Sequence, residues 1–122
     1  GIFLQNSENN TIKNNYIFNT AEVGLYLISS NNNLIYNNYF GELQNAYVEG
    51  GINNSFNISK TPGINIIGGL YLGGNYWSDY KLRYPDAQKI LLKGIWDTPY
   101  EINDGNNKDR YPLIKPFRKI LQ

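Results

Sequence analysis

The sequence predicts an all-β fold: a right-handed parallel β-helix, or solenoid, of about four coils with an irregular C-terminal cap. Three observations predict it. A segment of 17 residues recurs 23 positions later with nine identical columns. Apolar residues alternate within each copy, and asparagine, with 20 of 122 residues, punctuates the short apolar runs. Copies too short to bury their own apolar faces must stack on one another, as they do in a solenoid.

The first two copies are residues 1–17 (GIFLQNSENNTIKNNYI) and residues 24–40 (GLYLISSNNNLIYNNYF). Apolar side chains alternate in both, as at Ile2 and Leu4, and a period of two residues is that of a β-strand. Asparagine, serine and glycine break each run after a few residues and tolerate the backbone geometry of tight corners. Each copy is therefore predicted to consist of short strands joined by sharp corners.

A third copy begins at Asn45, and a fourth, two residues shorter, is assigned to residues 63–77 (GINIIGGLYLGGNYW). In a parallel solenoid, equivalent positions of successive coils lie above one another at about the strand spacing, ~4.8 Å. The predicted inward stacks are Ile2, Leu25 and Ala46; Leu4, Leu27, Val48 and Ile66; and Ile12, Ile35 and Phe56.

Asn10, Asn33 and Asn54 occupy equivalent positions and are predicted to form a ladder at one corner. Stacked side-chain amides can bond to each other along the axis, so that a buried polar column is satisfied from coil to coil. The ladder is thus expected to stabilise the stack.

One corner recurs as residues 15–17, 38–40 and 75–77, and its inward residue grows from isoleucine to phenylalanine to tryptophan. Trp77 is predicted to close the C-terminal end of the apolar core. The same stretch, GGNYWSDY at residues 73–80, is rich enough in aromatic and polar groups to be a binding site, which is the alternative interpretation.

Residues 1–77 are predicted to be the coils, and residues 78–122 a capping segment of the same domain. Four of the five prolines and nine of the eleven lysines and arginines lie in the second part. Proline cannot donate to a sheet ladder, so irregular structure is expected to cover the last coil and protect its open edge. Residues 97–100 (DTPY) and 109–113 (DRYPL) are predicted turn anchors, and residues 85–93 are compatible with a short helix.

The opposite end has no evident cap. The sequence opens on Gly1 in mid-coil, so we expect a processed product or a piece of a longer protein. Ile2, Leu4 and Ile12 are then expected to be covered by upstream coils of the parent chain or by a neighbouring copy. Head-to-tail docking of copies would build a filament unless rotation closes it into a ring, whereas two N-terminal faces that meet would give a closed dimer.

Composition excludes several classes of function. Cysteine, methionine and histidine are absent, which removes the usual ligands of copper, zinc and haem and the Ser-His and Cys-His nucleophilic sites. The net charge of +1 gives no general attraction to nucleic acid, and no apolar run is long enough to span a membrane. No cofactor is expected, copper included.

An enzyme acting on polysaccharides would need paired carboxylates on the solenoid wall. The coils carry Glu8, Glu22, Glu42 and Glu49 at non-equivalent positions, which form no obvious pair, and no catalytic residue is assigned.

Two outward aromatic columns are the candidates for carbohydrate binding, because aromatic rings stack against sugar faces. The alternative is that the rings stack on one another along the wall. Three sequons suit a glycosylated surface protein. The columns are Phe3, Tyr26 and Tyr47, and Tyr16, Tyr39 and Tyr76; the sequons begin at Asn9, Asn53 and Asn57.

The pattern G-φ-x-φ-x-x-S-x-x-N-x-φ-x-x-N-x-φ (φ apolar), with GGNYWSDY, DTPY and D-x-YPL after it, resembles the NosD-like parallel β-helix repeats of archaeal cell-surface and secreted proteins. The resemblance implies copper delivery to nitrous oxide reductase, which the missing ligands contradict. The broader repeat class is associated with carbohydrate binding and polysaccharide cleavage. Similar proteins carry an acidic, glycine-rich stretch before DTPY that suits calcium, whereas residues 81–94 here hold one acid. The remaining calcium candidates are Asp79, Asp97 and Asp109.

The sequence as a whole predicts a non-enzymatic β-solenoid module, extracellular or on the cell surface, that serves as a scaffold or adhesion unit. The alternative is a carbohydrate-binding or polysaccharide-cleaving β-helix protein of the lyase or hydrolase type.

Overall fold

The computed structural model describes residues 1–20, 22–90, 92–103 and 106–116. Within these residues the fold is all-β except for a single four-residue helix, α1 (Tyr80–Arg83). In the part of the chain described, no helix has the length and apolar character needed to cross a membrane. The all-β class predicted from the sequence is confirmed.

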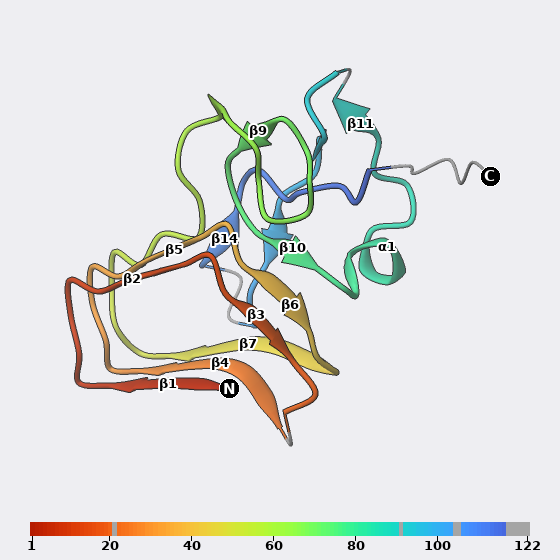
Figure 1. The fold of residues 1–122 in the computed structure, drawn as a ribbon. Coiled ribbons are helices and arrows are strands. Elements are labelled where there is room, and N and C mark those ends of the chain that lie inside the picture. Colours follow the sequence, from red (N-terminus) through yellow and green to blue (C-terminus); the bar gives the residue numbers. More distant parts are fainter. Residues whose placement is uncertain (21, 91, 104–105, 117–122) are drawn as a thin grey trace.

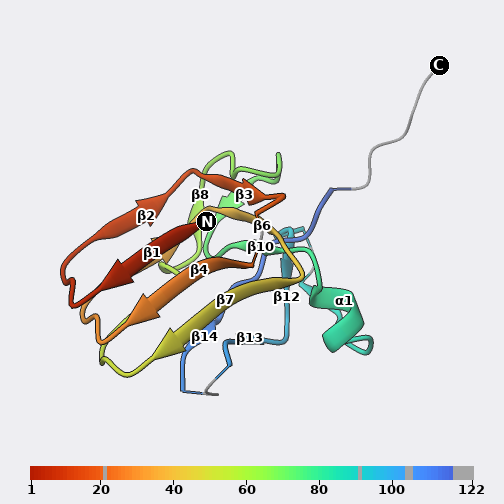
Figure 2. The ribbon, with the colours of Figure 1, turned by 90° about the horizontal axis from the view of Figure 1, so that it is seen from below.

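The first part of the chain runs repeatedly through three parallel sheets, and one passage through all three is called a coil here (Figures 1 and 2). The first sheet has the order β1 (Ile2–Gln5), β4 (Val23–Ile28), β7 (Gln44–Glu49). The second pairs β2 (Thr11–Lys13) with β5 (Leu34–Tyr36). The third has the order β10 (Tyr76–Trp77), β6 (Tyr39–Gly41), β3 (Tyr16–Phe18).

The registers confirm the predicted alignment of the first three copies. Ile2 pairs with Leu25 and Leu25 with Ala46, so the side chains of one inward stack succeed one another from coil to coil. Ile12 pairs with Ile35 in the second sheet, and a parallel bridge between Leu34 and Ser55 brings Phe56 above them. Alternation along each strand directs these apolar side chains into a common core.

Asparagine shapes the corners, as its frequency suggested. Asn9, Asn32 and Asn53 occupy equivalent positions and have φ values of 63°, 58° and 60°. Asn14 and Asn37 repeat the feature at the next corner, with φ of 62° and 56°. Asparagine adopts this left-handed backbone more readily than most residues, which explains why the repeat retains it there.

The predicted fourth copy is wrong. Residues 61–72 form an antiparallel hairpin of β8 (Thr61–Pro62) and β9 (Tyr71–Leu72), and Ile66 lies in its loop instead of joining the stack of Leu4, Leu27 and Val48. The hairpin projects beyond the coils (Figure 1). It is an insertion within the third coil, which β10 then completes by pairing with β6. The described chain therefore makes three coils rather than about four.

The error has a physical cause. A strand in a local hairpin has the same two-residue period as a strand in a coil, so alternation alone cannot say with which strand it pairs. The spacing of hydrogen-bonded asparagines reveals the insertion. Asn38 bonds to Asn15, which precedes it by 23 positions in the sequence, and to Asn75, which follows it by 37.

The C-terminal segment packs against β10 with α1 and two antiparallel hairpins. The hairpins pair β11 (Lys89–Ile90) with β12 (Ile95–Trp96), and β13 (Tyr100–Glu101) with β14 (Lys108–Asp109). Backbone N–H groups of Leu113 and Gly74 donate to the carbonyls of Asn75 and Tyr111, which joins this segment to the third coil.

The short helix predicted within residues 85–93 is also wrong. The helix that forms, α1, ends at Arg83, before this segment begins. Tyr84 lies before Pro85, and a residue in that position is disfavoured in helical conformation. Lys89 and Ile90 instead pair with Trp96 and Ile95 in the hairpin.

Trp77 lies at the C-terminal end of the core, as predicted, and is 1% exposed. Its indole ring stacks on Phe40 with centroids 4.6 Å apart and on Tyr100 with centroids 4.1 Å apart. Phe40 belongs to the coil below and Tyr100 to the capping segment, so Trp77 joins the two parts of the molecule.

Candidate functional site

The predicted asparagine ladder is present. Asn10 Nδ2 donates to Asn33 Oδ1 at 3.1 Å, and Asn33 Nδ2 donates to Asn54 Oδ1 at 3.0 Å. Each acceptor also receives the backbone N–H of the residue that donates to it. These amides are committed to holding the coils together.

A second ladder, which the sequence argument did not identify, runs through the other corner. Asn15 Nδ2 donates to Asn38 Oδ1 at 3.0 Å, and Asn38 Nδ2 donates to Asn75 Oδ1 at the same distance. Its signal was available, because the three residues open the corner that recurs before Ile17, Phe40 and Trp77.

The second ladder ends on a fully buried carboxylate, Asp109. Its Oδ2 accepts the backbone N–H of Asn75 at 2.6 Å and the indole N–H of Trp77 at 2.8 Å, and its Oδ1 accepts the N–H of Tyr111 at 2.9 Å. Burial raises the pKa of Asp109 to about 7, against the opposing effect of these donors. Gly74 leaves the space, since a Cβ there would lie 1.7 Å from Asp109 Oδ1.

The three calcium candidates belong to separate hydrogen-bond systems. Asp79 accepts from the Tyr100 hydroxyl at 2.9 Å, and Asp97 accepts from the N–H of Gln88 at 3.0 Å, a bond that lowers the pKa of Asp97. Asp109 accepts the indole N–H of Trp77 at 2.8 Å. Nowhere in the described chain do three acidic side chains gather as they would around a metal ion.

Among the residues that the structure describes, the four glutamates of the coils do not gather in a group of three or more acidic side chains either. Glu42 is buried, and both its carboxylate oxygens accept the N–H of Thr20, at 3.0 and 3.2 Å. Glu49 accepts from the Tyr26 hydroxyl at 3.4 Å, while Glu8 and Glu22 are exposed.

The first aromatic column lies on the outer face of the β1–β4–β7 sheet. Phe3 and Tyr26 meet edge to face with centroids 5.4 Å apart, as do Tyr26 and Tyr47 at 5.1 Å. Phe3 is 59% exposed and ends the column. The rings therefore contact one another, and Phe3 leaves the largest part of its surface free.

The second column follows the β3–β6–β10 sheet. Tyr39 and Tyr76 stack at 4.8 Å, whereas Tyr16 tilts by 40° against Tyr39 and is 61% exposed. Phe18 meets Tyr39 edge to face. The hydroxyl of Tyr16 donates to the carbonyl of Ile66 at 3.0 Å, which ties this column to the inserted hairpin.

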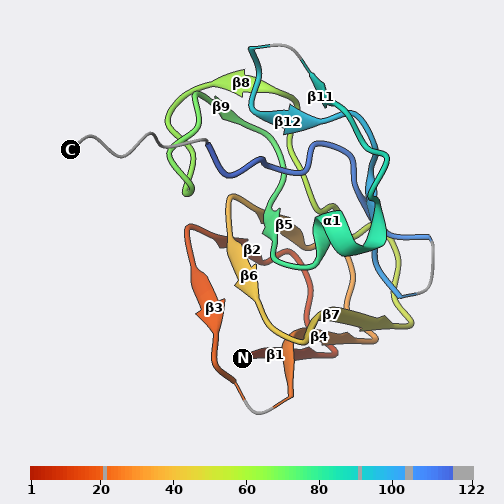
Figure 3. The same ribbon diagram turned by 90° about the vertical axis from the view of Figure 1, so that its right-hand side faces the viewer.

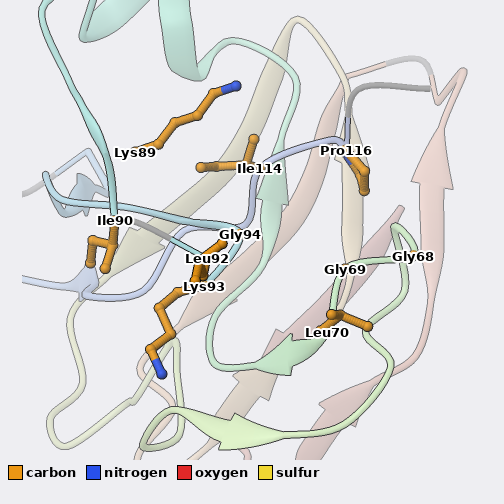
Figure 4. Close-up of a pocket in the computed structure, with 10 residues that line it drawn as sticks. All are labelled: Gly68, Gly69, Leu70, Lys89, Ile90, Leu92, Lys93, Gly94, Ile114 and Pro116. Atoms are coloured by element: carbon orange, nitrogen blue, oxygen red, sulfur yellow. The ribbon is translucent and has the colours of Figure 1, made fainter. Parts of the chain in front are cut away.

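The structure also contains a hollow of about 370 Å³ that no sequence pattern indicated (Figure 4). Three distant segments build it: residues 68–70 of the inserted hairpin, residues 89–90 and 92–94 of the β11–β12 hairpin, and the chain at Ile114 and Pro116. Because it depends on tertiary packing of an insertion against the capping segment, periodicity could not reveal it.

The sequons differ in their surroundings. Asn9 and Asn53 are exposed at equivalent corners with left-handed backbone. Asn57 is half-buried, and its Oδ1 accepts the N–H of Arg110 at 2.9 Å. Asn9 and Asn53 are thus the accessible pair.

Comparison with known families gives one match: the family model described as "Periplasmic copper-binding protein (NosD)" matches residues 1–82. This span covers the three coils and α1 up to Leu82. No curated protein and no solved structure matches the chain.

Proposed function

The chain belongs to the NosD family, whose model covers residues 1–82, and from this premise we propose that it is a right-handed parallel β-helix module of a surface or secreted protein. Its role is that of a non-catalytic scaffold or adhesion unit. The parallel pairing of successive coils supports the β-helix, and the right hand follows from the strong preference of parallel crossover connections. The word "periplasmic" in the family description supports a location outside the cytoplasm.

The scaffold role is supported chiefly by one observation: polar side chains of the coils form hydrogen bonds within the protein. Asn38 is fully buried and Asn75 continues its ladder onto Asp109, while Glu42 binds the N–H of Thr20. Buried polar groups that are fully hydrogen-bonded stabilise a unique arrangement of the chain. These groups are engaged in holding the coils and the capping segment together.

Incubation with a panel of soluble neutral and acidic polysaccharides should release no product. New reducing ends and unsaturated uronate products, measured over a day, are expected to stay at the level of the heat-denatured protein. The reason is the commitment of Glu42 and Asp109 to internal bonds. Steady product formation that heating abolishes would instead support a lyase or hydrolase.

Carbohydrate binding is the second candidate function. The exposed ring of Tyr16 favours it, because a free aromatic face at a hollow is a platform for the apolar face of a sugar. Binding without cleavage is compatible with an adhesion unit.

Copper, which the family description names, does not fit the residues present. The 122 residues contain no histidine, cysteine or methionine, so the donors left are carboxylate, amide, hydroxyl and backbone oxygen. Such oxygen ligands suit hard cations, whereas copper selects imidazole and sulfur.

Calorimetric titration with Cu(I) or Zn(II) is expected to show no strong site, and neither ion should raise the melting temperature. The missing soft ligands are the reason. A peptide carrying a Cys-x-x-Cys motif, titrated in parallel, verifies that the metal is available. A submicromolar affinity for this chain would contradict the ligand argument.

The partner expected at the N-terminal face stays a prediction. β1, β2 and β3 lie at the edges of their sheets, and Ile2 and Leu4 are only half-buried. Unpaired strand edges are protected in stable proteins, which supports a cover supplied by the parent protein or by a second copy.

A further inference from the structure

Four neighbouring hollows lie among β3, β6 and β10, the inserted hairpin, residues 113–116, the β11–β12 hairpin and α1. Figure 3 shows how β3, β6, α1 and the β11–β12 hairpin are arranged in space. Each hollow has lining residues in common with at least one other, and we call the group of four the lateral groove. The shared residues are Tyr16, Gly68, Lys89, Ile114, Lys115 and Pro116.

Aromatic and aliphatic side chains share the lining of the lateral groove. Tyr16 and Phe18 line the hollow beside β3 and β6, and Tyr76 and Trp96 line the hollow beside α1. These two hollows adjoin the same aromatic column, since Tyr39 of the first stacks on Tyr76 of the second at 4.8 Å. Aliphatic side chains such as Ile114 line the hollow between the inserted hairpin and the β11–β12 turn.

The charge of the lining has one sign. Four lysines, Lys81, Lys89, Lys93 and Lys115, line the groove, and no aspartate or glutamate does. The ion pair found among the described residues, between Arg83 and Asp79, does not involve them. Four cationic groups thus gather in one depression of a chain whose net charge is +1.

Two of these lysines are held by the protein and two are free to meet a ligand. Lys93 Nζ donates to the Tyr71 hydroxyl at 3.0 Å, and Lys81 Nζ donates to the carbonyl of Pro85 at 3.0 Å. Lys89 and Lys115 are exposed and form no described side-chain bond. Figure 4 shows that Lys89 and Lys93 extend in opposite directions, so their charges are distributed along the groove.

We propose that the lateral groove binds a linear anionic polysaccharide, such as a polyuronate. Pyranose rings have apolar faces that pack on Tyr16 and on the aliphatic walls, and a carboxylate on each sugar gives the lysines a repeated partner. A groove lined by one sign of charge concentrates such a polymer. The inference rests on the proposed function, since it supplies the ligand of the adhesion unit.

Single-stranded nucleic acid is a poorer fit. Its binding sites offer successive aromatic faces to successive bases. Here Tyr39 and Tyr76 stack on each other at 4.8 Å, so their facing surfaces are closed and Tyr16 is the exposed platform of the column.

Affinity electrophoresis and calorimetry with polygalacturonate test the proposal. Methyl-esterified polygalacturonate is the matched probe, because it keeps the polymer and removes the charge. The unmodified protein is expected to bind polygalacturonate at low salt, and its affinity should fall progressively as salt is added. Its affinity for the methyl-esterified polymer should be at least tenfold lower.

Matched variants localise the binding. The double substitution Lys89→Gln and Lys115→Gln should weaken binding about tenfold, since it removes the two exposed charges of the lateral groove that the protein does not itself bind. Lys13→Gln with Lys60→Gln removes the same charge from the coils and should change affinity less than about twofold. Tyr16→Leu, checked by its melting curve, should weaken binding to both forms of the polymer.

The proposal is overturned by equal losses in the two double variants, by equal binding of the esterified polymer, or by tighter binding of oligothymidylate or polyglutamate than of polygalacturonate. Absence of polygalacturonate binding also overturns it, but leaves the scaffold role standing. Cleavage of the polymer would instead refute the non-catalytic role while retaining the groove. The failures of the two proposals are therefore distinguishable.

Discussion

Replacement of Trp77 by alanine should lower the free energy of unfolding by about 3–5 kcal/mol. The indole is 1% exposed and lies between the rings of Phe40 and Tyr100, with centroids 4.6 and 4.1 Å away. The substitution removes both stacking contacts and leaves a cavity where the capping segment meets the coils. It also removes the indole N–H that donates to buried Asp109. Urea denaturation, monitored by circular dichroism, measures the loss of unfolding free energy.

Trp96→Ala is the matched control. Trp96 also stacks on an aromatic ring, that of Tyr80 at 5.2 Å, but it is half-buried on the surface hairpin. Its removal should cost about 1–2 kcal/mol, since partial exposure reduces both the lost burial and the cavity. A loss below about 1 kcal/mol for Trp77→Ala, or equal losses for the two tryptophans, would contradict the role assigned to Trp77.

The coils could be predicted because residues that stack in successive coils recur at a regular spacing in the sequence. Ile2 and Leu25, or Asn10 and Asn33, lie 23 positions apart in the sequence and directly beside one another in the fold. Periodicity fails where the pairing becomes local: the hairpin that contains Ile66 alternates like a coil but pairs with itself. The sequence therefore predicted the parallel sheets and not the insertion within the third coil.

The capping segment and the groove were less accessible to sequence reasoning. Asp109 was expected to anchor a turn, and it does accept the N–H of Tyr111. Its contacts with Asn75 and Trp77 span more than 30 positions and obey no repeat, so its burial could not be foreseen. The aromatic column was predicted by alternation, whereas Lys89 and Lys115 reach the same groove only through tertiary packing.

Stability is expected to fall as the pH rises from about 4 to above 7, because of Asp109. Burial raises the pKa of this carboxyl from its ordinary value of 3.8 to about 7 in the folded protein. An acid whose folded pKa is raised binds its proton more tightly in the folded state than in the unfolded one. Its contribution is complete below the unfolded pKa and is lost as the pH rises through the folded pKa. A pKa that rises from 3.8 to about 7 on folding corresponds to a contribution to the free energy of unfolding of roughly 4 kcal/mol at most.

The measurement is the free energy of unfolding at a series of pH values, for the unmodified protein and for Asp109→Asn. Other carboxyl groups contribute their own pH dependence to both proteins, so the difference between the two curves isolates Asp109. That difference should change most steeply between the two pKa values of 3.8 and about 7, where the folded state holds the proton and the unfolded state does not, and should level off above pH 7. Across this window the unmodified protein loses stability relative to the variant as the pH rises. The amide cannot ionise, and its NH2 group accepts no hydrogen bond, whereas both oxygens of the carboxyl group face N–H donors. The absolute stability of the variant is therefore expected to be lower than that of the unmodified protein at acid pH. Parallel curves would show that Asp109 does not titrate in this window. A relative gain of stability with rising pH would mean that the N–H groups of Asn75, Trp77 and Tyr111 outweigh burial and hold the carboxylate ionised.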